Sequence, residues 1–202
     1  MSKEKLIRKF DKQARLYEVR RKKKSERVWR EKLISCAKGR VLEVSVGAGA
    51  NFHYYSKDVQ VTAIDFSPEM LNKAKQAAVE IGIQAEFIHS DVESLSFPDE
   101  SFDTIVSTLS FCGYEDPQSV LGAFQKWCKR DGQILLLEHG ISSNRIIGGL
   151  QTIVDPLFKK VVGCRLNRDM VQILQQSNLH INKMENYMFG AVHLVWAAPN
   201  KN

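Results

Sequence analysis

The sequence predicts an α/β protein: a doubly wound, mainly parallel sheet with an antiparallel hairpin at its C-terminus, in a three-layer sandwich. Two observations support this fold class. Between residues 40 and 139, short apolar segments alternate with helix-like segments and the connections are short, which is typical of parallel strands joined by crossover helices. Near the C-terminus, the strand-like segments 181–187 and 191–198 flank a three-residue turn, as in a hairpin.

Length and composition indicate one globular domain. The chain has 202 residues, of which 44% are hydrophobic and 26% charged, enough to bury a full core. It contains no apolar run near the roughly 18 residues that span a membrane, and its charged N-terminus does not resemble a secretory signal. The four cysteines form no CxxC pair, which argues against a zinc site and suits free thiols in a reducing compartment. We therefore expect a cytoplasmic protein without a bound metal.

The positive charge is concentrated at the N-terminus. Residues 1–32 contain 14 Lys and Arg against 5 Asp and Glu, a net charge of +9, whereas the remainder has a net charge of −3. Such a segment is either a solvated helix face or a binding surface for lipid headgroups or RNA. We expect peripheral contact with an anionic membrane through residues 3–32, with nucleic acid as the less favoured partner. The sequence leaves the oligomeric state open.

Residues 3–35 predict a helix, in two pieces, because they contain no Gly or Pro. Leu6, Phe10, Ala14 and Tyr17 fall on one side of it. We interpret Phe10 and Tyr17 as packing residues of a cap over a site formed by the rest of the chain.

The sheet begins with a buried strand over residues 41–46, followed by a tight turn at Gly47 and Gly49 and the start of a helix or an irregular segment. Ser67 as N-cap, Pro68 in the first turn and Gly82 at the end define the next helix. The expected elements in order are strand 59–65, helix 67–81, strand 85–89, strand 103–107, helix 117–129, turn 131–132 and strand 133–138.

The last part of the chain departs from this alternation. Residues 141–164 predict an irregular, partly helical stretch that contains Gly148-Gly149 and Asp155-Pro156. Residues 167–177 predict a helix with Asn167 as its N-cap.

Four features meet at the carboxyl ends of the parallel strands, where open α/β sheets bind ligands. They are the turn at Gly47 and Gly49, Asp65 after the second strand, Asp91 after the third, and the loop 108–112 after the fourth. Asp65 lies 18 residues beyond Gly47, a spacing that places its carboxylate beside a ribose diol. Asp91 or its neighbouring backbone would accept a hydrogen bond from an exocyclic amine such as that of adenine.

The electrostatics of this site favour S-adenosylmethionine (SAM) over a dinucleotide. A pyrophosphate requires a third glycine for close approach of a helix, and Phe52 stands at that position. No Lys or Arg occurs between Val41 and Tyr55. Glu43, a carboxylate on a buried strand, needs a partner, and a ligand that carries an ammonium and a sulfonium provides one.

Four motifs follow one another along the chain: Phe10-Asp-Lys-Gln-Ala-Arg-Leu-Tyr17, Glu43-Val-Ser-Val-Gly-Ala-Gly49, Val61-Thr-Ala-Ile-Asp65-Phe-Ser-Pro-Glu-Met70 and Asp91-Val-Glu-Ser-Leu-Ser-Phe-Pro-Asp-Glu-Ser-Phe-Asp103. In this order they resemble class I SAM-dependent methyltransferases, in particular the UbiE-like (methyltransferase type 11) branch. The resemblance spans nearly the whole chain. It implies a Rossmann-like fold and methyl transfer from SAM.

The resemblance also implies a set of cofactor-binding residues. Ser45 replaces the first glycine of the family motif, so its side chain either narrows the room for the methionine moiety or adds a hydrogen bond. The expected cofactor-binding residues are Tyr17, Glu43, Ser45, Gly47, Ala48, Gly49, Asn51, Asp65, Phe66, Met70, Asp91, Val92, Thr108 and Leu109.

A further set of residues is similar to enzymes that methylate small thiols and to bacterial phospholipid N-methyltransferases. It consists of Gly47-Ala-Gly-Ala-Asn-Phe52, Leu137-Glu-His139, Gln151, Asp155-Pro156 and Gly163-Cys-Arg-Leu-Asn-Arg168. This resemblance implies a small-molecule or lipid-like methyl acceptor. We expect a single domain over residues 1–202, with 1–35 as a basic helical cap and 140–168 as an insertion on the substrate side.

His139 is the candidate catalytic base, because it ends the fifth strand at the site and titrates near neutrality. The alternative is a histidine that only binds backbone. Arg165 and Arg168 would hold an anionic acceptor, or are solvated charges at a helix start. The sequence thus predicts a SAM-dependent methyltransferase, and leaves two alternatives open: an RNA or protein methyltransferase, and a SAM-binding regulatory module without turnover.

Overall fold

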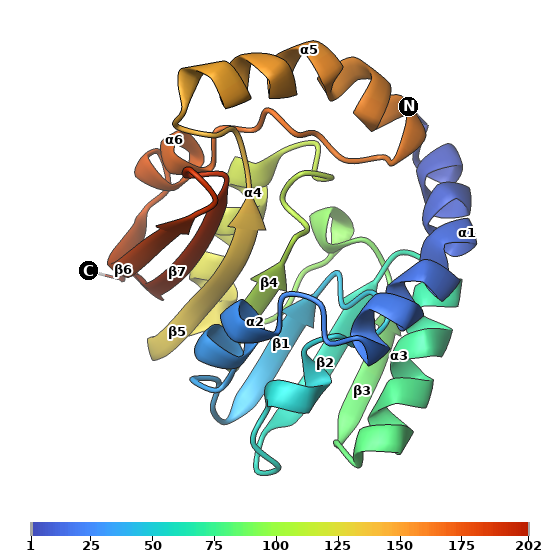
Figure 1. Ribbon diagram of the computed structural model, residues 1–202. Coiled ribbons are helices and arrows are strands. Elements are labelled where there is room, and N and C mark those ends of the chain that lie inside the picture. Colours follow the sequence, from blue (N-terminus) through green and yellow to red (C-terminus); the bar gives the residue numbers. More distant parts are fainter. Residues whose placement is uncertain (1, 202) are drawn as a thin grey trace.

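A computed structural model describes residues 2–201 and contains one seven-stranded sheet (Figure 1). The strand order is β3-β2-β1-β4-β5-β7-β6, in which the first five strands pair in parallel and β7 is antiparallel to both neighbours. The strands are β1 (Arg40–Val44), β2 (Gln60–Asp65), β3 (Ala85–His89), β4 (Phe102–Thr108), β5 (Cys128–His139), β6 (Leu179–Tyr187) and β7 (Val192–Pro199). The predicted Rossmann-like, mainly parallel sheet with a C-terminal hairpin is confirmed.

Helices cover both faces of this sheet and one end of it. They are α1 (Lys3–Lys22), α2 (Arg27–Ile34), α3 (Pro68–Ile81), α4 (Pro117–Trp127), α5 (Arg145–Val161) and α6 (Met170–Gln175), with the short 3-10 helices η1 (Phe52–Tyr54) and η2 (Val92–Ser94). α2 and α3 pack on one face, and α4 and α6 on the other. α5 lies beyond the carboxyl ends of the parallel strands, and α1 runs along α3 (Figure 1). None of these helices, within residues 2–201, has the length and apolar character needed to cross a membrane.

Alternating side chains of the central strands build the two cores. Leu42 and Val44 of β1 point to the α4 side, whereas Val41 points to α2 and α3. In β5, Ile134 points to the α4 side and Leu135 to the side of α2 and α3. Because both faces are covered, these strands are nearly continuous apolar runs, and their carboxyl ends are held in a fixed row.

The predicted signals of α3 are confirmed. The Ser67 Oγ accepts a hydrogen bond from the Met70 N–H at 3.2 Å, and Pro68 occupies the first turn. Gly82 ends the helix with a φ of +74°, a left-handed conformation that glycine adopts without strain. The start of this helix therefore lies directly beside the end of β2.

Of the two expectations for the segment after the glycine turn, the irregular segment is confirmed and the start of an α-helix is not. Turns and the single 3-10 helix η1 connect β1 to β2 over residues 45–59, all of which are described. Phe52 is buried beneath the turn, and the Tyr55 hydroxyl donates to Glu43 at 2.8 Å. Two aromatic side chains thus fix this irregular connection.

Residues 141–164 are more regular than predicted, because α5 is a continuous helix of 17 residues. The Asn144 side chain caps it by accepting the Ile146 N–H at 3.0 Å. Gly148 does not break the helix: a Cβ there would lie 3.0 Å from the Ser142 carbonyl oxygen, so the glycine serves close packing. The helix also continues through Pro156.

Two other boundaries differ from the prediction. The Asp169 carboxylate, rather than Asn167, caps α6 by accepting the Gln172 N–H at 2.9 Å, so this helix is shorter than expected. β5 begins at Cys128, and the predicted turn at 131–132 therefore lies inside the strand.

The glycine turn yields a test of packing. Gly49 has a φ of +77°, and a Cβ there would lie 2.9 Å from the Phe52 ring. We expect Gly49→Ala to lower the free energy of unfolding, measured with urea, by roughly 1–3 kcal/mol. Gly122→Ala in α4 is the matched control, since a Cβ there meets nothing within 4 Å; it should raise stability by up to about 1 kcal/mol. Equal effects of the two changes would contradict the packing explanation.

Candidate functional site

A cavity of about 480 Å³ lies at the carboxyl ends of β1, β2, β4 and β5, between α1 and α5. Its volume is typical of small-molecule and cofactor sites. Eleven of the fifteen residues predicted for the site line it: Tyr17, Ser45, Gly47, Ala48, Asp65, Phe66, Met70, Asp91, Thr108, Leu109 and His139. The fold thus brings together residues from six separate segments of the chain, and their individual roles stay predictions.

Asp65 joins the glycine turn to the start of α3. Its Oδ2 accepts the Gly47 N–H at 2.8 Å, and its Oδ1 accepts the Ser67 N–H at 2.9 Å. Burial raises the pKa of this carboxyl to about 6, although the two N–H donors favour the charged form. Each carboxylate oxygen can accept a further hydrogen bond, and Asp65 lines the cavity, as the binding of a ribose diol requires.

Four predicted residues lie outside the cavity wall: Glu43, Gly49, Asn51 and Val92. Glu43 was expected to face the ligand, but it is buried behind the turn, where its Oε1 accepts the Asn51 amide at 2.9 Å. Burial raises the pKa of Glu43 to about 7. Gly49 packs against the Phe52 ring, and Val92 packs in the core on the α4 side of the sheet.

Arg30 of α2 is a cavity residue that the sequence analysis missed. Its side chain is buried, and its Nη1 donates to the Asn51 Oδ1 at 2.7 Å and to the Thr108 Oγ1 at 3.1 Å. The Nη2 forms an ion pair with Glu26 at 3.4 Å. The absence of a basic residue between Val41 and Tyr55 was therefore misleading, because the fold supplies a cation from an upstream helix. Only the i,i+4 spacing of Glu26 and Arg30 hinted that this arginine is held in place.

Ser45 occupies a backbone conformation that favours glycine, with a φ of +51°. Its Oγ lies 3.0 Å from the Tyr114 hydroxyl, which in turn donates to the Ser110 Oγ at 3.0 Å. The serine therefore adds a hydrogen bond, one of the two possibilities that the sequence left open. Tyr114 also lines the cavity and was missed, since it stands 69 residues beyond Ser45.

The cap α1 crosses the cofactor end of the cavity. Asp11 accepts a hydrogen bond from the Ser67 Oγ at 2.5 Å, and Lys3 forms an ion pair with Asp91. The Phe10 ring packs edge-on against Phe66, with centroids 5.3 Å apart. The amphipathic pattern of α1 thus provides a wall of the site.

His139 lines the other half of the cavity, where β5 ends. Burial lowers the pKa of its imidazole, so the neutral form needed of a base prevails at neutral pH. Within residues 2–201 its ring has no hydrogen-bond partner, whereas His193, buried nearby, binds Asn186 at 2.8 Å.

The neighbouring Glu138 fixes the loop after β4. Its Oε1 accepts the Ser107 Oγ at 2.8 Å, and its Oε2 accepts the N–H groups of Ser110 and Phe111 at 2.9 and 3.1 Å. Burial raises the pKa of Glu138 to about 7. This buried carboxyl therefore positions the loop 108–112, which lines the cavity.

A ligand cavity above β1 and β2, in a seven-stranded sheet with β7 inserted antiparallel between β5 and β6, is the arrangement of class I SAM-dependent methyltransferases. Residues 42–136 match the family model described as a methyltransferase domain. Residues 42–136 thus carry the SAM-dependent methyltransferase domain that the motifs predict.

Individual relatives agree with this assignment. A phosphatidylethanolamine N-methyltransferase of Cereibacter sphaeroides is 39% identical over 103 residues, 50% of this chain and 51% of that protein. The thiol S-methyltransferase TMT1B of Rattus norvegicus is 29% identical over 165 residues, 79% of this chain and 63% of that protein. The crystal structure of the YcgJ protein of Bacillus subtilis has a TM-score of 0.65 at 18% identity, over 85% of this chain and 97% of that chain, which shows the fold alone. The chain spans less than two thirds of either curated relative.

Glu43 yields a test of pH dependence. Its pKa is about 7 in the folded state against an ordinary 4.5, so between these values the folded state holds more protons than the unfolded state. The free energy of unfolding therefore falls as the pH rises through this window. Glu43→Gln mimics the protonated form, and urea titrations should show it gaining roughly 1–3 kcal/mol relative to wild type between about pH 5 and about pH 8. Glu86→Gln, at an exposed position of β3, controls for the loss of one charge. A gain that does not change with pH would refute the assignment.

Proposed function

We propose that the domain transfers the methyl group of SAM to a small-molecule or lipid-like acceptor. The observation that best supports this is one continuous cavity that runs from Gly47 and Asp65 to His139 and the underside of α5. Methyl transfer requires cofactor and acceptor in one space that excludes water. The acceptor class is supported by the names of the relatives, a phosphatidylethanolamine N-methyltransferase and a thiol S-methyltransferase.

In this proposal the cofactor occupies the α1 end of the cavity. Asp65 accepts the ribose hydroxyls, Asp91 binds the adenine end after releasing Lys3, and the glycine turn allows close backbone approach. Arg30 presents a guanidinium that suits the carboxylate of the methionine moiety. Glu43 acts through Asn51 as a positioning residue for this arginine.

SAM, when bound, supplies a methyl group on a sulfonium that leaves readily. Alignment and exclusion of water then provide much of the rate. His139 takes the proton of an acceptor that must lose one, and its half-buried imidazole, whose lowered pKa favours the neutral form, suits this role.

An adjoining cavity of about 990 Å³ gives room for an anionic part of the acceptor. Arg165 and Arg168 both line it. Arg168 donates through its Nη2 to the Tyr114 carbonyl at 2.7 Å, while its buried Nε has no partner within residues 2–201. We propose that these two arginines bind a phosphate or carboxylate of the acceptor.

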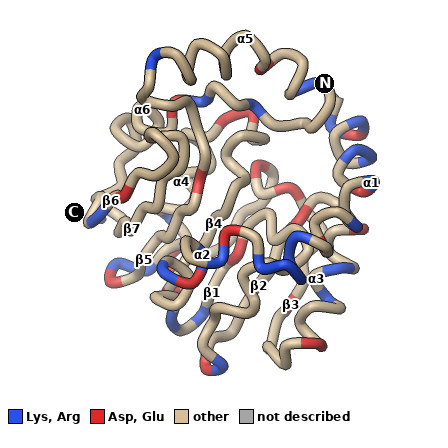
Figure 2. Tube along the Cα trace, viewed as in Figure 1, with Lys and Arg blue, Asp and Glu red and all other residues tan. Residues whose placement is uncertain are grey.

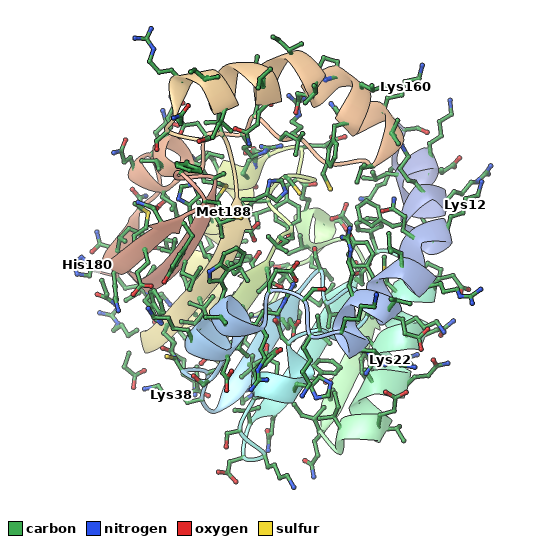
Figure 3. All side chains as sticks on the ribbon, in the orientation of Figure 1. Lys12, Lys22, Lys38, Lys160, His180 and Met188 are labelled. Carbon is green, nitrogen blue, oxygen red and sulfur yellow. The ribbon has the colours of Figure 1, made fainter. Side chains whose placement is uncertain are left out.

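Residues 1–35 act in this proposal as a cap and 140–168 as the substrate side of a single domain. The protein would work in the cytoplasm, in peripheral contact with membranes through residues 3–32. Basic positions follow α1 and its connection to α2 (Figure 2), and Lys12 and Lys22 project outward from α1 (Figure 3). Arg21 is an exception, since it is buried and paired with Glu80 at 2.9 Å.

Asp65→Ala tests the cofactor site. We expect the variant to lose SAM binding in calorimetry by about a hundredfold or more, because two charge-assisted hydrogen bonds disappear. Far-UV circular dichroism should show that the fold persists. Asp58→Ala, at an exposed turn before β2, should bind as wild type does. Unchanged affinity of Asp65→Ala would refute the site assignment.

His139→Ala separates catalysis from binding. We expect kcat to fall by about a hundredfold, as for loss of a general base, with SAM affinity changed less than about threefold. His139→Gln keeps a polar side chain of similar size and should be equally slow. Equal losses of kcat and SAM affinity would indicate that His139 has a structural role and is not a catalytic base.

The methyl acceptor can be found by incubating the protein with methyl-labelled SAM and fractionated cell extract. Label in lipid or small thiols is the expected result, and label in RNA or protein would favour the alternative enzyme classes. SAM binding without label in any fraction would favour a regulatory module.

A further inference from the structure

An apolar stripe runs along the outer side of α5. It consists of Ile146, Leu150, Ile153, Leu157 and Val161, named here the α5 stripe. Their spacing of three or four residues places them on one helix face, and each is between 58% and 76% exposed. The outer helix of a globular domain normally turns such a face toward the core. Here the helix lies at the end of the molecule with few charged positions along it (Figure 2).

The polar side chains of α5 point toward the protein instead. The Gln151 Oε1 accepts the Ser142 N–H at 2.7 Å, and its Nε2 donates to the Gly140 carbonyl at 3.1 Å. The buried Asp155 accepts the Leu166 N–H at 2.6 Å through its Oδ1. These bonds fix the rotation of the helix about its axis, so the exposure of the α5 stripe is part of the fold.

Further apolar surface lies beside the start of α5. Met188, labelled in Figure 3, and Phe189 lie in the turn between β6 and β7. Their side chains are 63% and 71% exposed. The Phe189 carbonyl accepts the Ser143 N–H at 3.0 Å, which fixes the turn against the segment that leads into α5.

Basic side chains border the α5 stripe at both ends. Arg145 begins the helix, and Lys159 and Lys160 lie in its last turn. The only acidic side chain of α5, Asp155, is buried, so every charge that the helix presents outward is positive. The Lys9 ammonium binds the Lys160 carbonyl, which adds the basic start of α1 to this end.

We propose that the α5 stripe inserts into the interfacial region of a membrane that contains anionic lipids, with α5 parallel to the membrane plane. An apolar helix face bordered by Lys and Arg is the pattern of helices that lie in this region, and anionic headgroups attract its borders. A second copy of the chain fits less well, because paired α5 faces would bring like charges together.

This orientation places the membrane next to the active-site cavity. Phe158 and Val162, on the inner side of α5 and at its end, line that cavity. If the acceptor is lipid-like, as proposed above, its acyl chain passes beside α5 from the membrane into the cavity without crossing bulk water.

Vesicle flotation of the full chain tests the proposal. We expect binding to phosphatidylcholine vesicles that contain phosphatidylglycerol, weaker binding to phosphatidylcholine alone, and loss of binding at high salt. Ile153→Asp with Leu157→Asp should reduce the bound fraction by about tenfold or more. Val79→Asp is the matched control, an 85% exposed valine on α3, and should bind as wild type does. Equal binding of the double variant and wild type would overturn the proposal.

Two further measurements keep the result unambiguous. Leu157→Trp should show a blue-shifted emission that brominated lipids quench, whereas Val79→Trp should show neither, and an unquenched Leu157→Trp would overturn insertion. Light scattering measures self-association. A dimer that Ile153→Asp converts to a monomer, together with no vesicle binding by the wild type, would overturn the proposal in favour of self-association.

Failure of the proposed function would look different. If vesicle binding depends on the α5 stripe but labelled SAM leaves no label in lipid, the membrane surface stands and the lipid-like acceptor is wrong. If Arg20→Glu with Lys23→Glu, both exposed at the end of α1, abolishes vesicle binding and the α5 double variant does not, the contact lies in residues 3–32 and this inference is wrong.

Discussion

A buried guanidinium holds the two halves of this site together. Arg30 reaches from α2 to the turn after β1 and to the end of β4, by donating to Asn51 at 2.7 Å and to Thr108 at 3.1 Å. The Asn51 side-chain amide in turn donates a hydrogen bond to Glu43 at 2.9 Å. A buried charge costs several kcal/mol unless it is partnered, so these side chains keep one another in place and the glycine turn can do without a following helix.

The same network sets the charge of the cavity. Burial raises the pKa of Glu43 to about 7 and that of Asp65 to about 6, because removing water destabilises the charged form of each carboxyl in the folded state. Arg30 and the backbone N–H groups around Asp65 oppose this cost. Arg30 and Asp65 both line the cavity, whereas Glu43 stays behind the turn, so the wall offers a guanidinium and a carboxyl to the proposed zwitterionic cofactor.

Elements with strong local signals could be predicted from the sequence, and elements set by distant contacts could not. α3 carries its cap, its first-turn proline and its terminal glycine within sixteen residues, 67–82, and both of its ends were predicted. α5 was missed in part because Gly148 suggested a break, whereas the structure uses it to pack against the Ser142 carbonyl. Within the site, the adjacent carboxylates were recognisable from strand ends. Arg30 and Tyr114 were not, because only the folded sheet brings them to the glycine turn.

The cap helix α1 has one more consequence, for the order in which ligands exchange. It is bonded to the cofactor side through Asp11 and Ser67, at 2.5 Å, and to the acceptor side through the Gln13 amide and the Val162 carbonyl, at 3.1 Å. Asp11 and Gln13 lie within one turn of a continuous helix, so neither bond can open widely while the other stays closed. In the proposed function, the spent cofactor and the methylated product would therefore leave through the same movement of α1.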